Sequence, residues 1–240
     1  MRLYWYYFLI CLSTFFLSII GIILTPFDWK GKIWARIVKY WAMSILWIGN
    51  IPYKIIGLEK LDPNQQYVFA SNHESAFDIP LTLAGIPWHV VPIAKKELKK
   101  IPFLSWAMLA AGHIFIDRSN HEKALESINN IKISLKKNPR SILIFPEGTR
   151  TLDGKMKPFK KGGVILAINT GLPIVPIACC GTFDVLVKGS KNFNPKLIEL
   201  RFGDPIFTTP KDIENRNEIT EQVQKAVSNL KFEWNNIENN

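Results

Sequence analysis

The hydrophobic pattern of this chain begins with two long apolar segments. Residues 3–24 contain no charged side chain and are long enough for a helix that crosses a bilayer core of about 30 Å. Residues 33–51 place apolar side chains on one helical arc, with Arg36 and Lys39 off it. The tryptophans of this segment favour a helix at the depth of lipid headgroups, and packing on the protein's own core is the alternative. The arc comprises Ile33, Trp34, Ile37, Val38, Trp41, Ile45 and Ile48.

Beyond these segments, short apolar runs alternate with helical patterns. Strands are predicted at residues 67–70, 90–94, 114–116, 142–145, 174–180 and 197–202. Helices are predicted from about residue 76, at 98–111, 121–137 and 162–169, and as an amphipathic segment at 219–234. Strands that alternate with helices are joined by crossovers, which predicts an α/β fold with a mostly parallel central sheet flanked by helices.

These patterns divide the chain into three parts. We expect residues 1–51 to form a membrane-embedded two-helix element, residues 52–210 to form the α/β domain, and residues 211–240 to form an amphipathic helix with a frayed tail. A chain of 240 residues suffices for one catalytic domain with an appendage and is too short for two ordinary ones.

The formal net charge of +10 points to an anionic partner. Lysines cluster at residues 95–100 and 155–161, beside apolar sequence and without a recognised nucleic-acid motif. Anionic lipid is therefore the expected partner rather than nucleic acid, because each cation near an anionic leaflet contributes on the order of 1 kcal/mol. Ordinary solubilising lysines are the alternative. Four basic residues follow the first apolar segment, which predicts that the domain lies on the cytoplasmic face of the cell membrane. They are Lys30, Lys32, Arg36 and Lys39.

The cysteines and histidines indicate neither a disulfide framework nor a metal site. Cys179 and Cys180 are adjacent in a predicted strand, so their side chains point to opposite faces, and Cys11 lies in the apolar start of the chain. Small core hydrophobes in a reducing compartment are the expected role of these thiols. The four histidines lack ligand-like spacing with the cysteines.

Three short motifs carry the candidate chemistry: NHESAFD at 72–78, GHIFIDR at 112–118 and FPEGTR at 145–150. The first places His73 five positions before Asp78, just after a predicted strand, where a base and the carboxylate that orients it can meet. The other two place Arg118 and Arg150 after similar runs, where loops at strand ends build sites. Arginine forks suit a phosphate.

Each of these residues also has a purely structural interpretation. Asp78 has the spacing of the third-position acid in a capping box with Ser75 as the N-cap, and His73 can be a hydrogen-bonded turn residue. Such a helix start at Ser75 would itself hold the carboxylate in place. Arg118 and Arg150 can be surface charges, which is the usual role of arginine.

The ordered motifs resemble the 1-acylglycerol-3-phosphate O-acyltransferases, the PlsC-type glycerolipid acyltransferases, from about Tyr67 to Gly181. A fourth block, LPIVPIACCG from residue 172, and the stretches KKELKKIPFLSW at 95–106 and PFKKGG at 158–163 also match. Glu74 and Thr151 depart from the commoner glutamine and serine. The resemblance also implies that bacterial relatives carry a two-helix element embedded in one leaflet.

The resemblance implies the site and the reaction. His73 and Asp78, in an H-x4-D spacing, would be the catalytic pair, and the residues matching the acceptor site are Arg118, Glu147, Gly148, Thr149 and Arg150. Arginine would hold the phosphate, and Glu147 with Gly148 would shape the glycerol pocket. The co-substrate would be acyl-coenzyme A or acyl-carrier protein, with no other cofactor, and the product phosphatidic acid.

Direct transfer is expected, because the chain has no G-x-S-x-G nucleophile elbow and its cysteines lie far from the histidine motif. His73 would then remove the proton of the acceptor hydroxyl. Three alternatives stay open: a different lysophospholipid acceptor, a phospholipid hydrolase that uses water in place of the acceptor, and a non-catalytic lipid-binding module.

Overall fold

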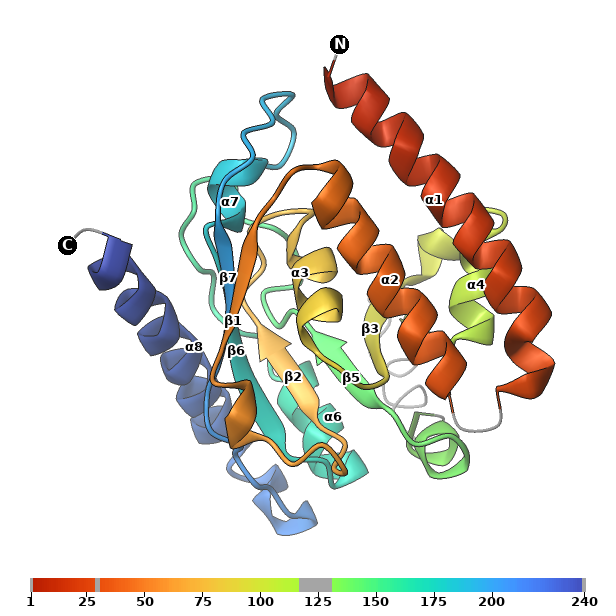
Figure 1. Ribbon diagram of the computed structural model, residues 1–240. Helices are drawn as coiled ribbons and strands as arrows, with labels where there is room; N and C mark the ends of the chain where they lie inside the picture. Colours follow the sequence, from red (N-terminus) through yellow and green to blue (C-terminus); the bar gives the residue numbers. More distant parts are fainter. Residues whose placement is uncertain (1, 29–30, 117–130, 239–240) are drawn as a thin grey trace.

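The computed structural model describes residues 2–28, 31–116 and 131–238, and begins with two antiparallel helices (Figure 1). α1 spans Arg2–Leu24, continues as the short 3-10 helix η1 (Thr25–Phe27), and packs on α2 (Lys32–Ile48). The two helices approach closely at Gly21, where a Cβ atom would lie 2.4 Å from the Trp34 ring. The two-helix arrangement expected from the sequence is therefore present.

A seven-stranded sheet with the order β1-β7-β6-β2-β5-β3-β4 forms the centre of the molecule. The strands β2 to β6 run parallel wherever they are neighbours, β7 is antiparallel to β6, and β1 is parallel to β7. The mostly parallel sheet predicted from the sequence is confirmed. The strands are β1 (Tyr53–Ile56), β2 (Val68–Ser71), β3 (Val90–Lys95), β4 (Ile114–Ile116), β5 (Ser141–Ile144), β6 (Ile174–Cys180) and β7 (Ile198–Phe202).

Helices cover both faces of the sheet, and side chains alternate between two cores. Phe69 of β2 packs with α2 and with α3 (Asp78–Gly85) on one face. Val68 and Ala70 pack on the other face, with α6 (Gly162–Thr170) and α8 (Arg216–Glu238). Further elements are α4 (Leu104–Ala110), α7 (Thr182–Val185) and the 3-10 helices η2 (Leu58–Lys60), η3 (Lys96–Lys100) and η4 (Pro210–Ile213), and residues 131–137 are also helical.

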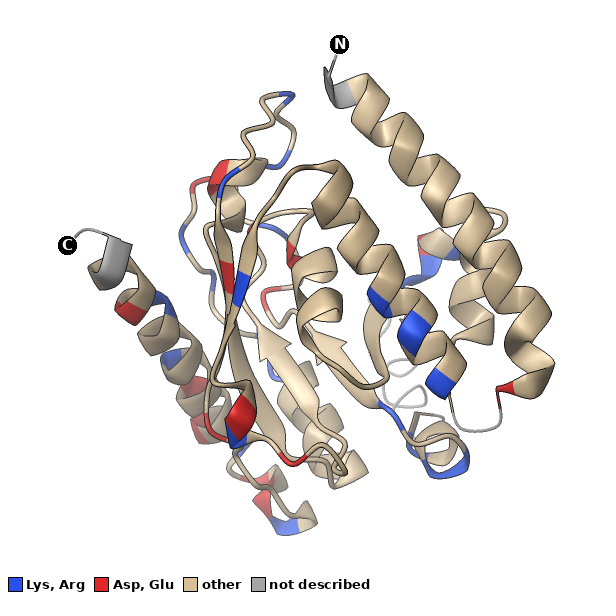
Figure 2. Cartoon of the chain, in the orientation of Figure 1, with Lys and Arg blue, Asp and Glu red and all other residues tan. Residues whose placement is uncertain are grey.

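The environment of α2 corrects one expectation. Its apolar arc does not face a lipid surface: Trp34, Ile37 and Ile45 are buried, and α2 packs on α3 and α1. An apolar arc of this kind is compatible with contact to a membrane and with contact to a protein core. Only the elements that pack against it in the folded chain distinguish the two. The charged residues of α2 lie toward its N-terminus, whereas α1 carries none from Leu3 onward (Figure 2).

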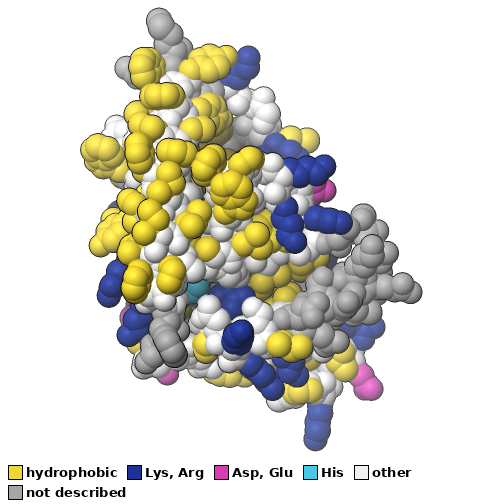
Figure 3. Space-filling model, turned by 90° about the vertical axis from the view of Figure 1, so that its right-hand side faces the viewer, with side chains coloured by type: hydrophobic (Ala, Val, Ile, Leu, Met, Phe, Trp, Pro, Cys, Tyr) yellow, Lys and Arg dark blue, Asp and Glu magenta, His cyan; other side chains and the backbone are white. Residues whose placement is uncertain are grey.

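Large apolar side chains are instead exposed along α1. The helical segment Tyr4–Phe27, which comprises most of α1 together with η1, is long and apolar enough to cross a membrane. Figure 3 shows them gathered on one face of the molecule, with Lys and Arg side chains around its edges. Exposed aromatic side chains of α2 and of the α4 region add to the apolar surface. Examples are Trp5, Phe8, Phe16 and Ile23 of α1, Trp47 of α2, and Phe103, Trp106 and Leu109 near α4.

Three further details differ from the sequence-based expectations. The helix predicted at 98–111 is divided into η3 and α4, because Phe103 between them has a positive φ of 59°. β1 was not predicted, since it is a four-residue edge strand with half-exposed side chains. The predicted helix at 121–137 lies partly outside the described residues, and residues 131–137 of it are helical.

Candidate active site

His73 and Asp78 meet at the carboxyl end of β2. His73 Nδ1 lies 2.8 Å from Asp78 Oδ2. That oxygen also accepts the backbone N–H groups of Glu74 and Ser75, at 2.7 and 2.9 Å, and Thr182 Oγ1 donates to Asp78 Oδ1 at 2.5 Å. An acceptor surrounded by donors is a carboxylate, so the Asp78 side chain fixes the proton of His73 on Nδ1. Nε2 is then the basic nitrogen.

Local structure holds this pair in place from both sides. Asn72 exchanges two hydrogen bonds of 2.8 Å with the backbone of Cys179, which ties the start of the loop to β6. At the other end, Asp78 is the first residue of α3, where the helix dipole favours a negative charge. Asp78 is fully buried, while the His73 side chain remains 17% exposed. The loop therefore presents the imidazole and hides its orienting carboxylate.

The capping-box interpretation is half right. Asp78 does accept the backbone N–H of Ser75, but α3 begins at Asp78 and its N-cap, Phe77, makes no side-chain cap. The Ser75 hydroxyl donates instead to the carbonyl of Leu186 at 2.8 Å. Tertiary contact with the residues after α7 thus takes the place of a local cap.

Glu147 supports the same loop and does not line the cavity beside His73. Its Oε1 accepts the backbone N–H of His73 at 2.7 Å, and its Oε2 accepts the backbone N–H of Lys157 at 2.9 Å. The side chain is buried, which raises the pKa of its carboxyl group. Glu147 thus holds the backbone of the His73 loop, and its expected contact with glycerol stays a prediction.

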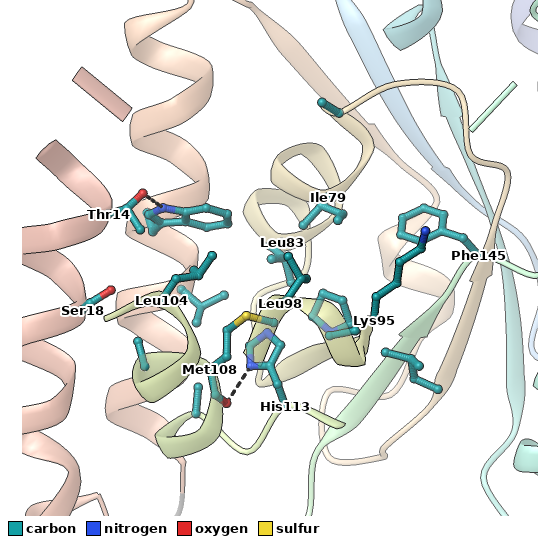
Figure 4. Close-up of a pocket in the computed structure, with 18 of the residues that line it drawn as sticks. Thr14, Ser18, Ile79, Leu83, Lys95, Leu98, Leu104, Met108, His113 and Phe145 are labelled. Atoms are coloured by element: carbon teal, nitrogen blue, oxygen red, sulfur yellow. Dashed lines mark hydrogen bonds between the residues drawn. The ribbon is translucent and has the colours of Figure 1, made fainter. Parts of the chain in front are cut away.

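A cavity of about 550 Å³ opens at His73 and extends between α1, α2, α3 and α4. Phe145 stacks on the His73 ring with 4.0 Å between the ring centroids. In Figure 4, Leu83, Leu98 and Leu104 point into the same space, and the Lys95 amine points toward Phe145. Such a long apolar cavity next to a basic imidazole suits a hydrocarbon chain whose reactive end lies at His73.

Met108 and His113 also line the cavity. His113 Nδ1 lies 3.1 Å from the Met108 carbonyl oxygen, and burial lowers the pKa of His113 to about 4. Its ring is therefore neutral at pH 7 and adds no charge to the apolar space.

The end of the cavity at His73 is basic. Lys95, Arg150 and Lys188 line it, and no Asp or Glu of the described residues does so. Gly148 and Thr149 line the cavity as well, and Gly148 has a φ of +77°, a conformation that favours glycine. Arg118 lies outside the described residues. Of the predicted acceptor residues, the structure thus brings Gly148, Thr149 and Arg150 together beside His73.

Comparisons with known proteins agree with this architecture. A family model described as Acyltransferase matches residues 53–180. The chain belongs to this acyltransferase family. The 1-acyl-sn-glycerol-3-phosphate acyltransferase of Cocos nucifera is 34% identical over 215 residues, which cover 88% of this chain and 68% of that protein. The enzyme of the same name from Saccharomyces cerevisiae is 33% identical over 201 residues, which cover 82% and 66%.

The acyltransferase also has a solved structural relative. The crystal structure of the 1-acyl-sn-glycerophosphate (LPA) acyltransferase PlsC from Thermotoga maritima superimposes with a TM-score of 0.81 at 25% sequence identity. The match covers 94% of this chain and 91% of that one, so it includes parts of the chain on both sides of the family-model match.

Three site residues of the acyltransferase were not identified from the sequence. Thr182 and Lys188 follow the last motif, and the sequence predicts for Phe145 only its place at the end of a strand and at the start of FPEGTR. Phe145 begins FPEGTR, so its place next to His73 follows once β2 and β5 are paired in parallel. Thr182 carried no local signal, because its contact with Asp78 joins residues 104 positions apart.

Proposed function

We propose that this acyltransferase transfers a fatty-acyl group from a thioester to the free hydroxyl of 1-acylglycerol 3-phosphate and so makes phosphatidic acid. The observation that carries the proposal is the oriented His73–Asp78 pair at the mouth of an apolar cavity, beside a cationic patch that suits a phosphate. The named activity of the relatives supports the same substrate class.

In the proposed reaction, His73 Nε2 takes the proton of the acceptor hydroxyl as its oxygen attacks the thioester carbonyl carbon. Asp78 keeps the other nitrogen protonated and stabilises the imidazolium that forms. When the tetrahedral intermediate collapses, the thiolate leaves and takes the proton back from His73. This direct transfer involves no covalent acyl-enzyme. Cys179 is poorly suited to act as a nucleophile, because it is fully buried and burial raises the pKa of its thiol.

The surroundings of the pair suggest how the two substrates bind. The cavity between α1 and α4 would receive an acyl chain, which places the thioester carbon near His73. Arg150, a planar cation on the FPEGTR loop, would bind the acceptor phosphate. Gly148, with Thr149, would shape the space for glycerol.

We also propose that α1 anchors the enzyme in a membrane, where the lysolipid acceptor would be located. The exposed aromatic and aliphatic side chains of α1 would contact acyl chains, and nearby lysines such as Lys99 and Lys100 would contact anionic headgroups. Catalysis on the cytoplasmic face is part of this proposal and is supported by the basic residues after α1.

The experiment that tests this function is product formation from labelled acyl-coenzyme A and 1-acylglycerol 3-phosphate by membranes that contain wild-type or His73→Ala protein. Wild type should make phosphatidic acid, and the variant should make almost none. Parallel reactions replace the donor by acyl-carrier protein or the acceptor by a lysophospholipid with another headgroup. Full turnover by His73→Ala would reject the catalytic assignment, and fatty-acid release without an acceptor would indicate a hydrolase.

A further inference from the structure

The segment after α7 brings a lysine to the catalytic end of the cavity from outside every motif of the sequence. Lys188 lines the cavity together with His73 and Arg150. Its Nζ donates a hydrogen bond of 3.1 Å to Thr149 Oγ1, on the loop that carries Arg150. The residue lies beyond the end of the family-model match at residue 180.

The backbone around Lys188 is attached to the catalytic pair itself. Thr182, at the start of α7, donates to Asp78 Oδ1, and the Ser75 hydroxyl donates to the carbonyl of Leu186. After Lys188, the Phe193 ring stacks on the Phe77 ring at 5.6 Å between centroids and on the Tyr6 ring of α1 at 4.9 Å. The position of Lys188 is therefore fixed by the same contacts that order the His73–Asp78 loop.

The charges around Lys188 favour an anion as its ligand. The charged residues that line this cavity in the described parts of the chain are Lys95, Arg150 and Lys188, all cationic. Lys196, ten residues from the start of the same segment, is instead paired with Asp184 at 2.6 Å. No ion pair joins Lys188 to a described carboxylate, and its hydrogen bond to Thr149 occupies one of the three N–H donors of an ammonium group.

We propose that Lys188 is a substrate-binding residue that contacts the phosphate monoester of the lysolipid acceptor and sets the preference for this headgroup. A phosphate monoester carries a charge of about −1.5 to −2 at pH 7 and has three acceptor oxygens. The guanidinium fork of Arg150 can bind two of them, and a lysine on the opposite side can bind the third as a point charge. A phosphodiester with an amine-bearing headgroup has less negative charge and gains less from a second cation.

This inference rests on the proposed function, and kinetics separates the two. In Lys188→Met, we expect the KM for 1-acylglycerol 3-phosphate to rise about tenfold or more, as loss of one charge-assisted hydrogen bond predicts. The kcat at saturating acceptor and the KM for the acyl donor should stay within about twofold of wild type, because removing ground-state binding does not alter the chemical step. Lys188→Arg should retain most of the acceptor affinity.

The matched control is Lys191→Met, which removes an exposed lysine three residues away on the same segment and should leave all constants unchanged. A second measurement uses glycerol 3-phosphate, the headgroup without its acyl chain, as a ligand in calorimetric titrations of detergent-solubilised wild-type and variant protein. Binding should be weakened by Lys188→Met and not by Lys191→Met.

The possible outcomes are distinguishable. An unchanged acceptor KM and unchanged glycerol 3-phosphate binding in Lys188→Met would overturn the role of Lys188 and leave the proposed acyl transfer intact. A loss of kcat with equal increases in both KM values would also overturn it, because it would show a structural role. If wild type did not acylate 1-acylglycerol 3-phosphate, the proposed function would fail, and the binding measurement would still test the phosphate site.

Discussion

At the scale of single residues, the site depends on one buried carboxylate with four donors around it. Asp78 receives hydrogen bonds from His73, Thr182 and two backbone N–H groups. A neutral amide at this position has the same shape, but its N–H2 group must face at least one donor. Charge at Asp78, more than its size, should therefore control both the tautomer of His73 and the order of the loop.

Asp78→Asn tests this dependence. We expect kcat to fall by about a thousandfold to ten-thousandfold, since an Asn side chain no longer holds the proton on Nδ1 of His73. Thr182→Val, which removes only the hydroxyl that donates to Oδ1, should cost about tenfold. The comparison uses initial rates at saturating substrates, and equal rates for Asp78→Asn and wild type would contradict the proposed role of Asp78.

At the scale of elements, α8 is joined to the His73–Asp78 loop by a buried ion pair. Lys231 of α8 donates to Glu74 Oε1, and Glu74, the neighbour of His73, is only 3% exposed. Burial lowers the pKa of Lys231 to about 8. The predicted amphipathic helix at 219–234 thus packs on the sheet, and through Lys231 it also contacts the residue next to His73.

Removal of Lys231 should destabilise the fold because it leaves the Glu74 carboxylate buried without its partner. We expect Lys231→Met to lower the free energy of unfolding by about 3–5 kcal/mol and the Tm by roughly 10 °C. The double variant Glu74→Gln with Lys231→Met should recover most of this loss, since no buried charge remains. Thermal unfolding in detergent measures the effect. Lys225→Met, at an exposed position of α8, is the control, and a Tm equal for all variants would contradict the coupling.

The cavity depends on α4, whose two sides have different surroundings. Ala107 is buried against the cavity, whereas Leu109 of the same helix is 54% exposed. Ala107→Phe should fill part of the cavity and shift the donor preference toward shorter acyl chains, with a loss of kcat/KM for long chains of about tenfold or more. Competition between donors of different chain lengths measures the shift. Leu109→Phe should leave the preference unchanged, and an identical profile for Ala107→Phe would place the acyl chain elsewhere.

At the scale of the whole molecule, the two N-terminal helices have separate tasks. α2 contributes several side chains to the core on one face of the sheet. α1 lies on the outer side of α2 (Figure 1); it contributes Tyr6 to that core and exposes its other described aromatic side chains. The enzyme thus combines a soluble-type α/β core with one helix whose surface is suited to lipid.

Charged substitutions on the exposed side of α1 test its role in membrane attachment. Phe16→Lys combined with Ile23→Lys should release a substantial share of the protein from membranes, because each lysine costs about 3 kcal/mol at the bilayer centre. Phe232→Lys, an exposed apolar residue of α8, is the matched control and should stay bound. Sedimentation with vesicles measures the distribution. Full binding of the α1 double variant would show that another surface anchors the enzyme.

The sequence determined the features that depend on short-range order. Six of the seven strands, the long α1, and the contact between His73 and Asp78 all follow from periodicity or from spacings of a few residues, because neighbouring side chains must share one strand, turn or helix start. The same applies to the NHESAFD and FPEGTR loops, which lie where parallel strands end.

Only the tertiary structure decided which partners those residues have. The burial of the α2 arc, the hydrogen bonds of Glu147 to the backbone, and the contacts of Thr182, Lys188 and Lys231 around His73 all depend on segments distant in the chain. The periodic pattern of apolar residues indicates which side chains share one face of a helix or strand. It carries no information on what packs against that face, which is set by the order of strands in the sheet and by the connections between them.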